Sequence, residues 1–392
     1  MDIFSKCENY SAARDAQASG LYPYFIALEE SEGSLATFNG KTLIMCGSNN
    51  YLGLTTHPEV QEAAQNAISR FGTSCTGSRF LNGTLQLHEQ LEIELAEWLG
   101  KDRALVFSTG MQVNLGTISS LVGRKDYVIL DKEDHASIVD GARLSYGDLI
   151  RYKHNDMEDL AGKLSRLSPD RGKLLVVDGL YSMEGDIASL PEIIPLCKEY
   201  NVRLMVDDAH AVGVLGKGRG TAAHFDLTDD VDLIMGTFSK SFASIGGYIA
   251  GNDVVIDFIK HNARSLIFSA SIPGPNAAAA LAALHVMQRE PERIERVNQI
   301  GETMRTELVR LGFDIGFSET PVVPIIIGDD TLTLKTWKLL FENGVFVNPV
   351  LSPAVPPGRQ LLRTSYMATH TDDQIDQVLT IFENTGQQLG LI

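Results

Sequence analysis

The stretch RLMVDDAHAVGVLGKGRGTAAHFDLTDDVDLIMGTFSKS at residues 203–241 decides the fold. It holds two short apolar runs, RLMVD (203–207) and DLIMG (232–236), and polar residues follow each run directly. Four more runs of this kind stand at intervals along the chain: ALVF (104–107), YVIL (127–130), LLVVD (174–178) and YIAG (248–251). Unbroken apolar runs separated by helical stretches are typical of parallel strands that are covered on both faces. The sequence therefore predicts an α/β fold with a large, mostly parallel, doubly wound sheet, whose ligands lie beyond the carboxyl ends of its strands.

Three units are predicted along the chain. Residues 1–45 form an N-terminal arm and hairpin: residues 1–20 read as a helical arm, and SLATFNGKTLIM (34–45) reads as a hairpin that turns at Asn39-Gly40. Residues 46–288 form the large domain, which ends at the break QREPE (288–292). Residues 289–392 form a smaller α+β C-terminal domain.

The smaller domain is predicted from its alternating pattern. The expected elements are a helix from Ile294 to Leu311, strand VVPIII (322–327), a helix at 332–343, strand VFVN (345–348) and a last helix after the capping box Thr371-x-x-Gln374. Between the last two lies the loop SPAVPPGRQ (352–360), whose three prolines make it stiff.

The composition excludes several classes of protein. The chain has 392 residues, 44% of them hydrophobic, and a formal net charge of -17. The hydrophobic fraction argues against wholesale disorder, and the acidic balance argues against broad nucleic-acid binding. Four scattered cysteines and nine dispersed histidines predict neither a disulfide framework nor a metal site, and they fit a reducing cytosol. No run approaches the ~18 apolar residues of a membrane span.

Residues with chemical potential follow the predicted strands. Lys240, after the run DLIMG, could form a Schiff base with a carbonyl compound, or it could be a surface lysine. Asp207, at the end of RLMVD, could pair with a protonated heterocycle, or it could cap a helix. Ser108-Thr109-Gly110-Met111 opens a helix whose N–H groups could bind phosphate, or it is a simple cap. His135 could stack on a flat ring or serve the structure alone.

These residues lie within a series of spaced motifs. The series runs STG…N, DHASIVDG, GLYSMEGD, VDDAHAVG with GRG, GTFSK with GG, and LLRTS. It resembles the α-oxoamine synthases, which are pyridoxal-phosphate enzymes of fold type I, the aspartate-aminotransferase-like fold. The resemblance extends from SNNYLGL (48–54) to LLRTSYMATHT (361–371).

The resemblance implies roles for individual residues. Lys240 would carry pyridoxal 5'-phosphate as a Schiff base, Asp207 would pair with its ring nitrogen, and His135 would stack on the ring and help to orient the substrate. The remaining cofactor residues would be His210 and Ser182 at the ring oxygen, and Gly110, Met111, Thr237, Ser239 and Ser271 at the phosphate. Arg363 would bind the substrate carboxylate, with Asn50 and Tyr51 nearby. One departure concerns a Ser-Thr-Ser run of many relatives, which here reads Ser269-Ala270-Ser271.

Within the family, GSRFLNGT (77–84), GTFSKS (236–241) and the proline loop are most similar to soluble bacterial serine palmitoyltransferases. This similarity implies condensation of L-serine with a long-chain acyl-CoA such as palmitoyl-CoA. The products would be 3-ketodihydrosphingosine (3-oxosphinganine), CoA and CO2, the first step of sphingolipid synthesis. It also implies a cytoplasmic homodimer with shared active sites, and peripheral contact with the inner membrane stays open.

Other functions remain open on the sequence alone. The nearest is a sister enzyme, 8-amino-7-oxononanoate synthase or glycine C-acetyltransferase, which would use alanine or glycine. An aminotransferase and a non-catalytic α/β scaffold are further alternatives. For the acyl chain, candidate contacts are Trp337, Phe341, Phe346, Val350 and Leu351, although an ordinary core role accounts for most of them.

Overall fold

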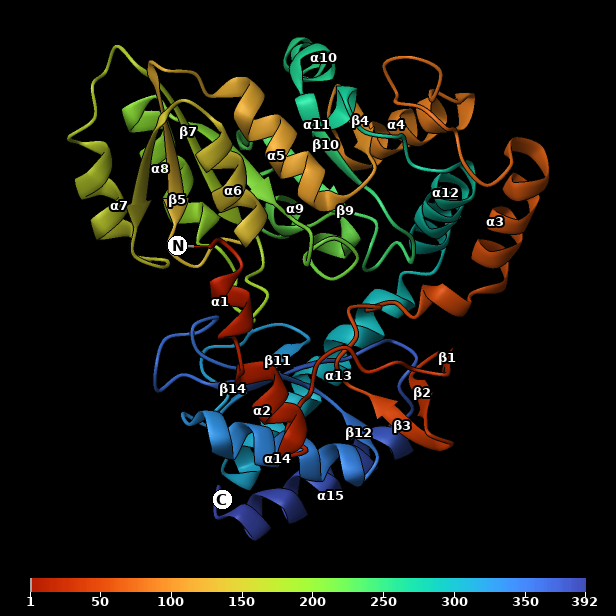
Figure 1. Ribbon diagram of the computed structural model, residues 1–392. Helices are drawn as coiled ribbons and strands as arrows, with labels where there is room; N and C mark the ends of the chain where they lie inside the picture. The colour runs from red at the N-terminus through yellow and green to blue at the C-terminus, as the bar shows by residue number, and fades with distance from the viewer. Residues whose placement is uncertain (1) are drawn as a thin grey trace.

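A seven-stranded sheet forms the centre of the upper body in Figure 1, in the order β4-β10-β9-β8-β7-β5-β6. The structure is a computed structural model that describes residues 2–392. The strands are β4 (Arg103–Phe107), β5 (Asp126–Asp131), β6 (Asp148–Tyr152), β7 (Gly172–Asp178), β8 (Arg203–Asp207), β9 (Leu233–Thr237) and β10 (Gly247–Gly251). Each of the six predicted apolar runs is therefore a strand, and the mostly parallel α/β sheet is confirmed.

Two features of this sheet differ from the expectation. Strand β10 was expected to be parallel, but it runs antiparallel to both β9 and β4. The reason is the short link between Thr237 and Gly247, because a crossover to a parallel strand needs a dozen residues or more. Strand β6 was not predicted, since it lies at the sheet edge and most of its side chains are at least partly exposed.

Helices cover both faces of the sheet. Along β7, Leu174 and Val176 join one apolar cluster, whereas Leu175 and Val177 join another on the opposite face. Helices α5, α6, α10 and α11 pack on the first face, and α4, α7, α8 and α12 on the second. The helices of this body are α3 (Pro58–Phe71), α4 (Gln86–Leu99), α5 (Gly110–Leu121), α6 (Ala136–Leu144), α7 (Met157–Leu164), α8 (Leu190–Tyr200), α9 (Thr221–His224), α10 (Asp253–Asn262), α11 (Arg264–Ile267) and α12 (Gly274–Arg289). Short 3-10 turns lie at Leu54–Thr56, Gly216–Gly218 and Thr228–Asp230.

The lower body in Figure 1 is built around a second apolar core. Its long helix α13 (Glu292–Leu311) buries Ile294, Val297, Ile300, Met304 and Leu308 at the predicted helical spacing. The other elements are α14 (Asp330–Glu342), α15 (Asp372–Leu389) and the antiparallel strands β11 (Val322–Ile326), β13 (Asn348–Val350) and β14 (Leu361–Ser365). The predicted capping box of Thr371 and Gln374 begins α15. Trp337 is buried in this core, so for that residue the ordinary core role is confirmed.

The predicted N-terminal hairpin is present and joins the lower body. Its strands are β2 (Leu35–Phe38) and β3 (Lys41–Met45). An additional strand, β1 (Glu30–Glu32), pairs with β2, and β12 (Val345–Phe346) pairs with β3 in parallel. Asn39 and Gly40 have φ values of 49° and 70°, the left-handed conformation that a two-residue hairpin turn requires. The first and last quarters of the chain therefore share one sheet.

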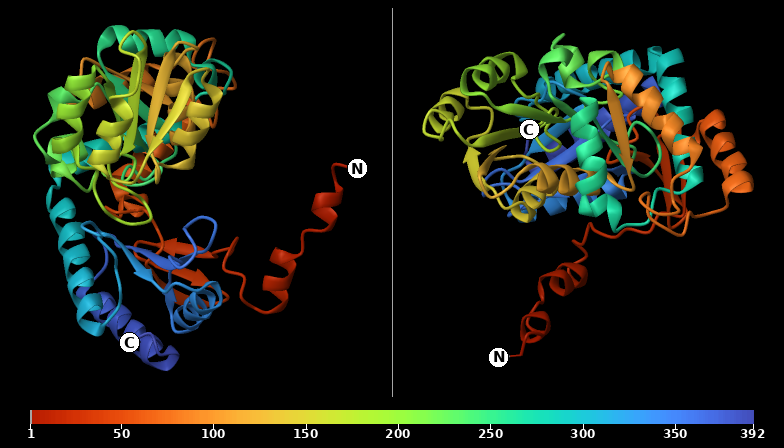
Figure 2. Two further views of the ribbon diagram at one scale, coloured as in Figure 1. Left: turned by 90° about the vertical axis from the view of Figure 1, so that its left-hand side faces the viewer. Right: turned by 90° about the horizontal axis from the view of Figure 1, so that it is seen from above.

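The segment before the hairpin extends away from both bodies, as Figure 2 shows. The predicted helical arm consists of two short helices, α1 (Ser5–Glu8) and α2 (Ala12–Ala18), and neither helix buries a residue. Residue 1 of the predicted arm lies outside the described residues. Across residues 2–392, no helix combines the length and the apolar character that crossing a bilayer requires.

Candidate active site

A cavity of about 310 Å³ opens at the carboxyl ends of β7, β8 and β9. This is the edge at which a doubly wound sheet is expected to bind ligands. All of the predicted cofactor residues except Ser271 line it: Gly110, Met111, His135, Ser182, Asp207, His210, Thr237, Ser239 and Lys240. The fold therefore brings together residues that lie up to about 130 positions apart in the chain, as a crevice between strand ends and helix starts does.

Lys240 lies three residues after the end of β9 and is partly buried in the cavity wall. Burial lowers its pKa to about 8, although the carboxylates of Asp207 and Asp178 oppose this change. A lysine with such a pKa is partly an uncharged amine near neutral pH, which is the form that attacks a carbonyl carbon. The surface-lysine alternative does not fit this environment.

Asp207 is the last residue of β8 and is buried. One carboxylate oxygen, Oδ2, accepts a hydrogen bond of 2.7 Å from Asn114 Nδ2, and Oδ1 accepts one of 3.0 Å from the backbone N–H of Ala209. Hydrogen bonds from two donors fix the carboxylate at the cavity wall. A buried carboxylate in this position can pair with a cationic ring nitrogen of a bound ligand.

His135 precedes α6, and its ring is exposed toward the cavity. Its backbone N–H donates to Asp178 Oδ2 at 2.9 Å, and its Nδ1 lies 2.7 Å from Ser137 Oγ. Partial removal from water lowers the pKa of His135, Asp207 opposes this change and the charge of Lys240 adds to it. The ring therefore stays neutral at neutral pH and can pack against a flat ligand.

The start of α5 and the loop after β9 lie side by side at the cavity. Thr109 caps this helix, and its Oγ1 accepts a hydrogen bond of 3.2 Å from the N–H of Gln112. Gly110 lies so close to Thr237 that an added Cβ would stand 2.8 Å from Thr237 Oγ1, which in turn lies 2.8 Å from Ser239 Oγ. Two hydroxyl groups thus stand beside a helix N-terminus, an arrangement that can bind phosphate.

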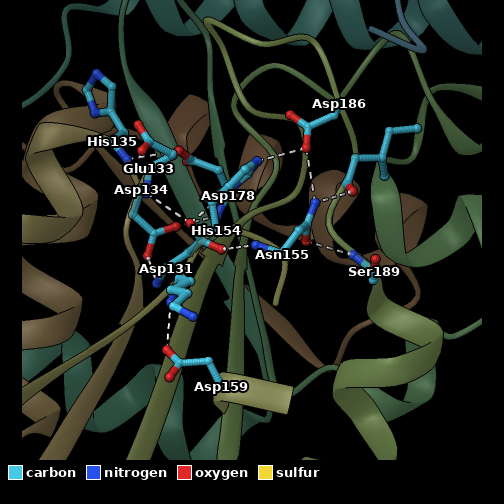
Figure 3. A network of polar contacts seen from close by, with 12 residues as sticks. Asp131, Glu133, Asp134, His135, His154, Asn155, Asp159, Asp178, Asp186 and Ser189 are labelled. Carbon is cyan, nitrogen blue, oxygen red and sulfur yellow. Dashed lines mark hydrogen bonds and ion pairs between the residues drawn. The ribbon is translucent and has the colours of Figure 1, made fainter. Parts of the chain in front are cut away.

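A polar network that we did not predict from the sequence lies next to His135, as Figure 3 shows. His154 lies between two carboxylates, with Nδ1 2.9 Å from Asp131 and Nε2 2.9 Å from Asp186. Burial opposes its charge, but the hydrogen bonds to both carboxylates outweigh burial and raise its pKa to about 10. Asp134 connects this region to the site, because its Oδ1 accepts a hydrogen bond of 3.0 Å from the N–H of Asp178.

The sequence did hold a signal for this network. Strands β5, β7 and β8 each end in an aspartate, namely Asp131, Asp178 and Asp207. Neighbouring parallel strands bring their carboxyl ends to one sheet edge, so these side chains had to gather there. Burial raises the pKa of Asp178 and of Asp134, and the negative charge of nearby carboxylates raises them further.

The predicted substrate residue Arg363 lies on β14 and is buried. Its Nε donates to the carbonyl oxygen of Ser182 at 2.6 Å, and its Nη2 lies 2.9 Å from Asn49 Oδ1 and 3.4 Å from the hydroxyl of Tyr51. The same Tyr51 hydroxyl lies 2.7 Å from His210 Nδ1. These contacts connect the lower body to the wall of the cavity.

Asn50 and Ser271 are placed differently from the other predicted residues. Asn50 Nδ2 donates to Thr55 Oγ1 at 2.8 Å, and it is the neighbouring Asn49, which we did not predict, that contacts the guanidinium of Arg363. Ser271 is buried and its N–H donates to the carbonyl oxygen of Gly77, away from the cavity of its own chain. A role for Ser271 at the cofactor phosphate therefore requires a second subunit and stays a prediction.

Comparison with known proteins identifies the family. Residues 41–382 match the family model described as aminotransferase class I and II. The chain belongs to this family. It is 51% identical over 378 residues to a serine palmitoyltransferase of Sphingobacterium spiritivorum, and the match covers 96% of this chain and 95% of that protein. The resemblance to the α-oxoamine synthases and their serine palmitoyltransferases is thereby confirmed.

A solved structure and a sister enzyme complete the comparison. A serine palmitoyltransferase variant from S. paucimobilis with a bound PLP–myriocin aldimine superimposes with a TM-score of 0.97 at 36% identity, covering all of both chains. An 8-amino-7-oxononanoate synthase of Thermoanaerobacter pseudethanolicus is 40% identical over 380 residues, 96% of each protein. The family thus includes both activities, and the serine enzyme is the more similar one.

The side chains around the cavity fit pyridoxal phosphate. The cavity offers an anion-binding helix N-terminus, an amine with a lowered pKa and a buried carboxylate. A ligand with a phosphate group, a reactive aldehyde and a ring nitrogen that binds a proton needs these three partners. The cofactor of this family therefore suits the donor set of this chain.

Proposed function

We infer that this protein is a pyridoxal-phosphate-dependent serine C-palmitoyltransferase. It condenses L-serine with a long-chain acyl-CoA and releases CoA, CO2 and 3-oxosphinganine. The geometry supports the cofactor and the reaction class, and the observation that carries the choice of serine is the 51% identity to a serine palmitoyltransferase over nearly the whole chain. The sister enzymes are less similar, at 40% identity for an 8-amino-7-oxononanoate synthase.

Each cavity residue has a defined task in this proposal. When bound, pyridoxal phosphate supplies an electron-accepting ring that makes the α-carbon of an attached amino acid acidic. Lys240 Nζ, with a pKa of about 8, accepts the α-proton and later returns a proton to the same carbon. Asp207 binds the ring nitrogen and keeps it protonated, while His135 packs against the ring. Gly110 and Thr237 belong to the phosphate site.

Arg363 binds the substrate carboxylate in this proposal. A guanidinium and a carboxylate form two parallel hydrogen bonds when both are free to meet. In the structure Nη2 of Arg363 is occupied by Asn49 at 2.9 Å and by Tyr51 at 3.4 Å. The incoming carboxylate replaces these two contacts, and the released Tyr51 hydroxyl keeps its bond to His210.

The site is completed by a second copy of the chain in this proposal. Met111 and Ile245 line the cavity, yet 50% and 46% of their surfaces are exposed. Phe268 and Leu81, on segments that join at the Ser271–Gly77 hydrogen bond, are 75% and 77% exposed. An apolar rim of this kind is typical of an interface, and this supports the proposal of a homodimer with shared active sites. A mass measurement in solution by light scattering tests it.

A cytoplasmic location with peripheral contact to the inner membrane is the remaining part of the proposal. Its support is indirect: the acyl substrate and the product are lipid-like. Cys7, Cys46, Cys75 and Cys197 are unpaired in the structure, as in a reducing compartment. Fractionation of cells with and without a salt wash tests the membrane contact.

The decisive experiment offers three amino acids to the purified enzyme. The visible absorption of the bound cofactor is recorded while L-serine, glycine or L-alanine is added, and products are then identified after addition of palmitoyl-CoA. We expect L-serine to change the spectrum and 3-oxosphinganine to form. Product from alanine or glycine alone would assign a sister activity, and accumulation of pyridoxamine phosphate without acyl-CoA would assign an aminotransferase.

Two lysine variants complete this experiment. Lys240→Ala removes both the attachment point and the base, so turnover should fall by at least ~10²–10⁴-fold, the usual contribution of a general base. Lys132→Ala, at an exposed lysine outside the cavity, is the matched control and should keep full activity. Normal turnover by Lys240→Ala would contradict the proposed function.

A further inference from the structure

Two buried side chains with no role so far, Asn114 and Ser137, connect Asp207 to His135. Asn114 lies on α5 and is fully buried, and Ser137 lies at the start of α6 with 2% of its surface exposed. We propose that they are positioning residues, which link the His135 ring to Asp207 and fix it as the neutral tautomer with its hydrogen on Nε2. This inference rests on the proposed function only for its consequence in catalysis.

The first link runs from Asp207 to Asn114. Asn114 Nδ2 lies 2.7 Å from Asp207 Oδ2 and 2.8 Å from Ser137 Oγ. An ionised carboxylate accepts hydrogen bonds and donates none, so the amide atom that faces it is the nitrogen. Both hydrogens of that nitrogen are then in use, one toward each partner. Asp207 thereby sets the orientation of the amide.

Asn114 Oδ1 supports this assignment. It is buried and, within residues 2–392, has no hydrogen-bond partner. Turning the amide over would not relieve this, because the oxygen would then face the carboxylate of Asp207. A buried acceptor left unpaired is uncommon, and here it accompanies an amide whose two donors are both engaged.

The second link runs from Ser137 to His135. Because Ser137 Oγ accepts a hydrogen bond from Asn114, its own hydrogen is free to be donated, and His135 Nδ1 lies 2.7 Å away. The backbone N–H of Ser137 points at the same ring nitrogen, at 3.2 Å. Two donors converge on Nδ1, so this atom carries the lone pair and the hydrogen of the neutral ring is on Nε2.

The position of His135 at a helix start reinforces this state. His135 is the N-cap of α6, and the positive end of a helix disfavours a proton on a nitrogen that accepts from its N–H groups. The charged and titratable groups near the ring are Asp207 and Lys240, which act on its pKa in opposite directions, His210 in the same cavity, and Asp178, which accepts from the backbone N–H of His135. The ring atom available to the cavity is therefore a donor.

A donor at Nε2 matters for the proposed reaction. The substrate carboxylate and the carbonyl oxygen of the acyl thioester are both acceptors, and a neutral Nε2–H can bind either without adding a charge. The opposite tautomer would present a lone pair to these oxygens and repel them. Asn114 and Ser137 thus set the chemical character of His135 without touching the substrate.

The test reads the tautomer of His135 directly. The full-length protein with bound cofactor and without substrate is labelled with ¹⁵N-histidine, and ring nitrogens with and without hydrogen are distinguished by their separate NMR shifts. His135→Gln identifies the resonances by their loss. We expect the wild type to show an unprotonated Nδ1 and a protonated Nε2. Ser137→Ala leaves only the backbone N–H at 3.2 Å as a donor to Nδ1, so in this variant and in Asn114→Leu we expect a mixture of the two neutral tautomers, with part of the molecules carrying hydrogen on Nδ1.

Ser145→Ala is the matched control. Ser145 follows the same helix α6, and its hydroxyl donates to the carbonyl oxygen of Ala142 at 2.7 Å, away from His135. The control should keep the wild-type pattern. If Asn114→Leu does not fold, Ser137→Ala decides alone, because it removes only one hydroxyl group.

Either of two results would overturn the proposal. One is a wild-type ring with hydrogen on Nδ1 or on both nitrogens. The other is a folded Ser137→Ala protein that keeps the wild-type pattern. Neither result depends on which amino acid the enzyme accepts, so a failure of the serine assignment would leave this measurement intact.

Discussion

The stability of this protein should depend on the charge of His154, and the structure gives the size of the effect. The His154 ring bridges Asp131 and Asp186 at 2.9 Å on each side, and its pKa is raised from its usual 6.5 to about 10. Each pKa unit between the folded and the unfolded state corresponds to about 1.4 kcal/mol, so the protonated ring contributes at most about 4 to 5 kcal/mol. His154→Gln keeps a similar volume and removes the charge.

The contribution should vary with pH in a defined direction. Below pH 6.5 the ring is protonated in both the folded and the unfolded state, so the full contribution is present. Between 6.5 and about 10 only the folded state holds the proton, and stability falls as the pH rises, by about 1.4 kcal/mol for each pH unit. At pH 8 about 3 kcal/mol should remain, and above pH 10 nothing.

Urea unfolding of the wild type and of His154→Gln at pH 6, 7, 8 and 9 measures this difference. Subtracting the two free energies at each pH removes the titration of all other groups. His261→Gln is the matched control, since His261 is exposed and lies 3.5 Å from its nearest carboxylate oxygen, on Asp257. A free-energy difference between wild type and His154→Gln that is the same at every pH would refute this account of the network.

Three further perturbations have defined outcomes. Gly110→Val places a Cβ 2.8 Å from Thr237 Oγ1, so it should weaken cofactor binding in an equilibrium titration and leave the fold intact, and unchanged affinity would argue against the phosphate site. Glu92→Gln removes the charge that pairs with buried Arg79 at 2.7 Å, and urea unfolding should show a loss of about 3 to 5 kcal/mol, whereas a loss below 1 kcal/mol would show that water reaches the pair. Finally, labelling of Lys240 in cofactor-free protein by an amine reagent should rise with pH through a midpoint of about 8, and a midpoint near 10.5 would mean that burial does not act on it.

Much of the sheet could be predicted because its strands are short apolar runs with polar ends. Parallel strands that are covered on both faces need no alternation of apolar and polar side chains. The continuous apolar runs that end at Asp178 and Asp207 are examples. Strand β6 has no such run, since an edge strand exposes much of its surface. The direction of β10 could also have been predicted, because the nine residues between Thr237 and Gly247 are too few for a crossover helix.

The site could be predicted only where chemistry and strand ends coincide in the sequence. Lys240 and Asp207 both follow an apolar run, and they line one cavity. The contact between Asn49 and Arg363 joins positions 314 residues apart, and no local pattern reports a pairing at that distance. The contacts of Asn114 could not be predicted from a local pattern either, because its partners are fixed by how α5 packs against the sheet.

The parallel pairing of β3 with β12 has a consequence for the order in which the chain folds during synthesis. Ile44 pairs with Val345, so a ribosome that adds about 5–20 residues per second completes the partner about 15–60 s after the hairpin has emerged. Nearly all of the upper body, from Pro58 to Arg289, is made within that interval and can fold first. The hairpin meanwhile presents an open strand edge, which invites pairing with other chains. In cells that make much of this protein, the growing chain is therefore most prone to aggregate through its N-terminal hairpin. This period ends when the last quarter of the chain, which contains β12, is released.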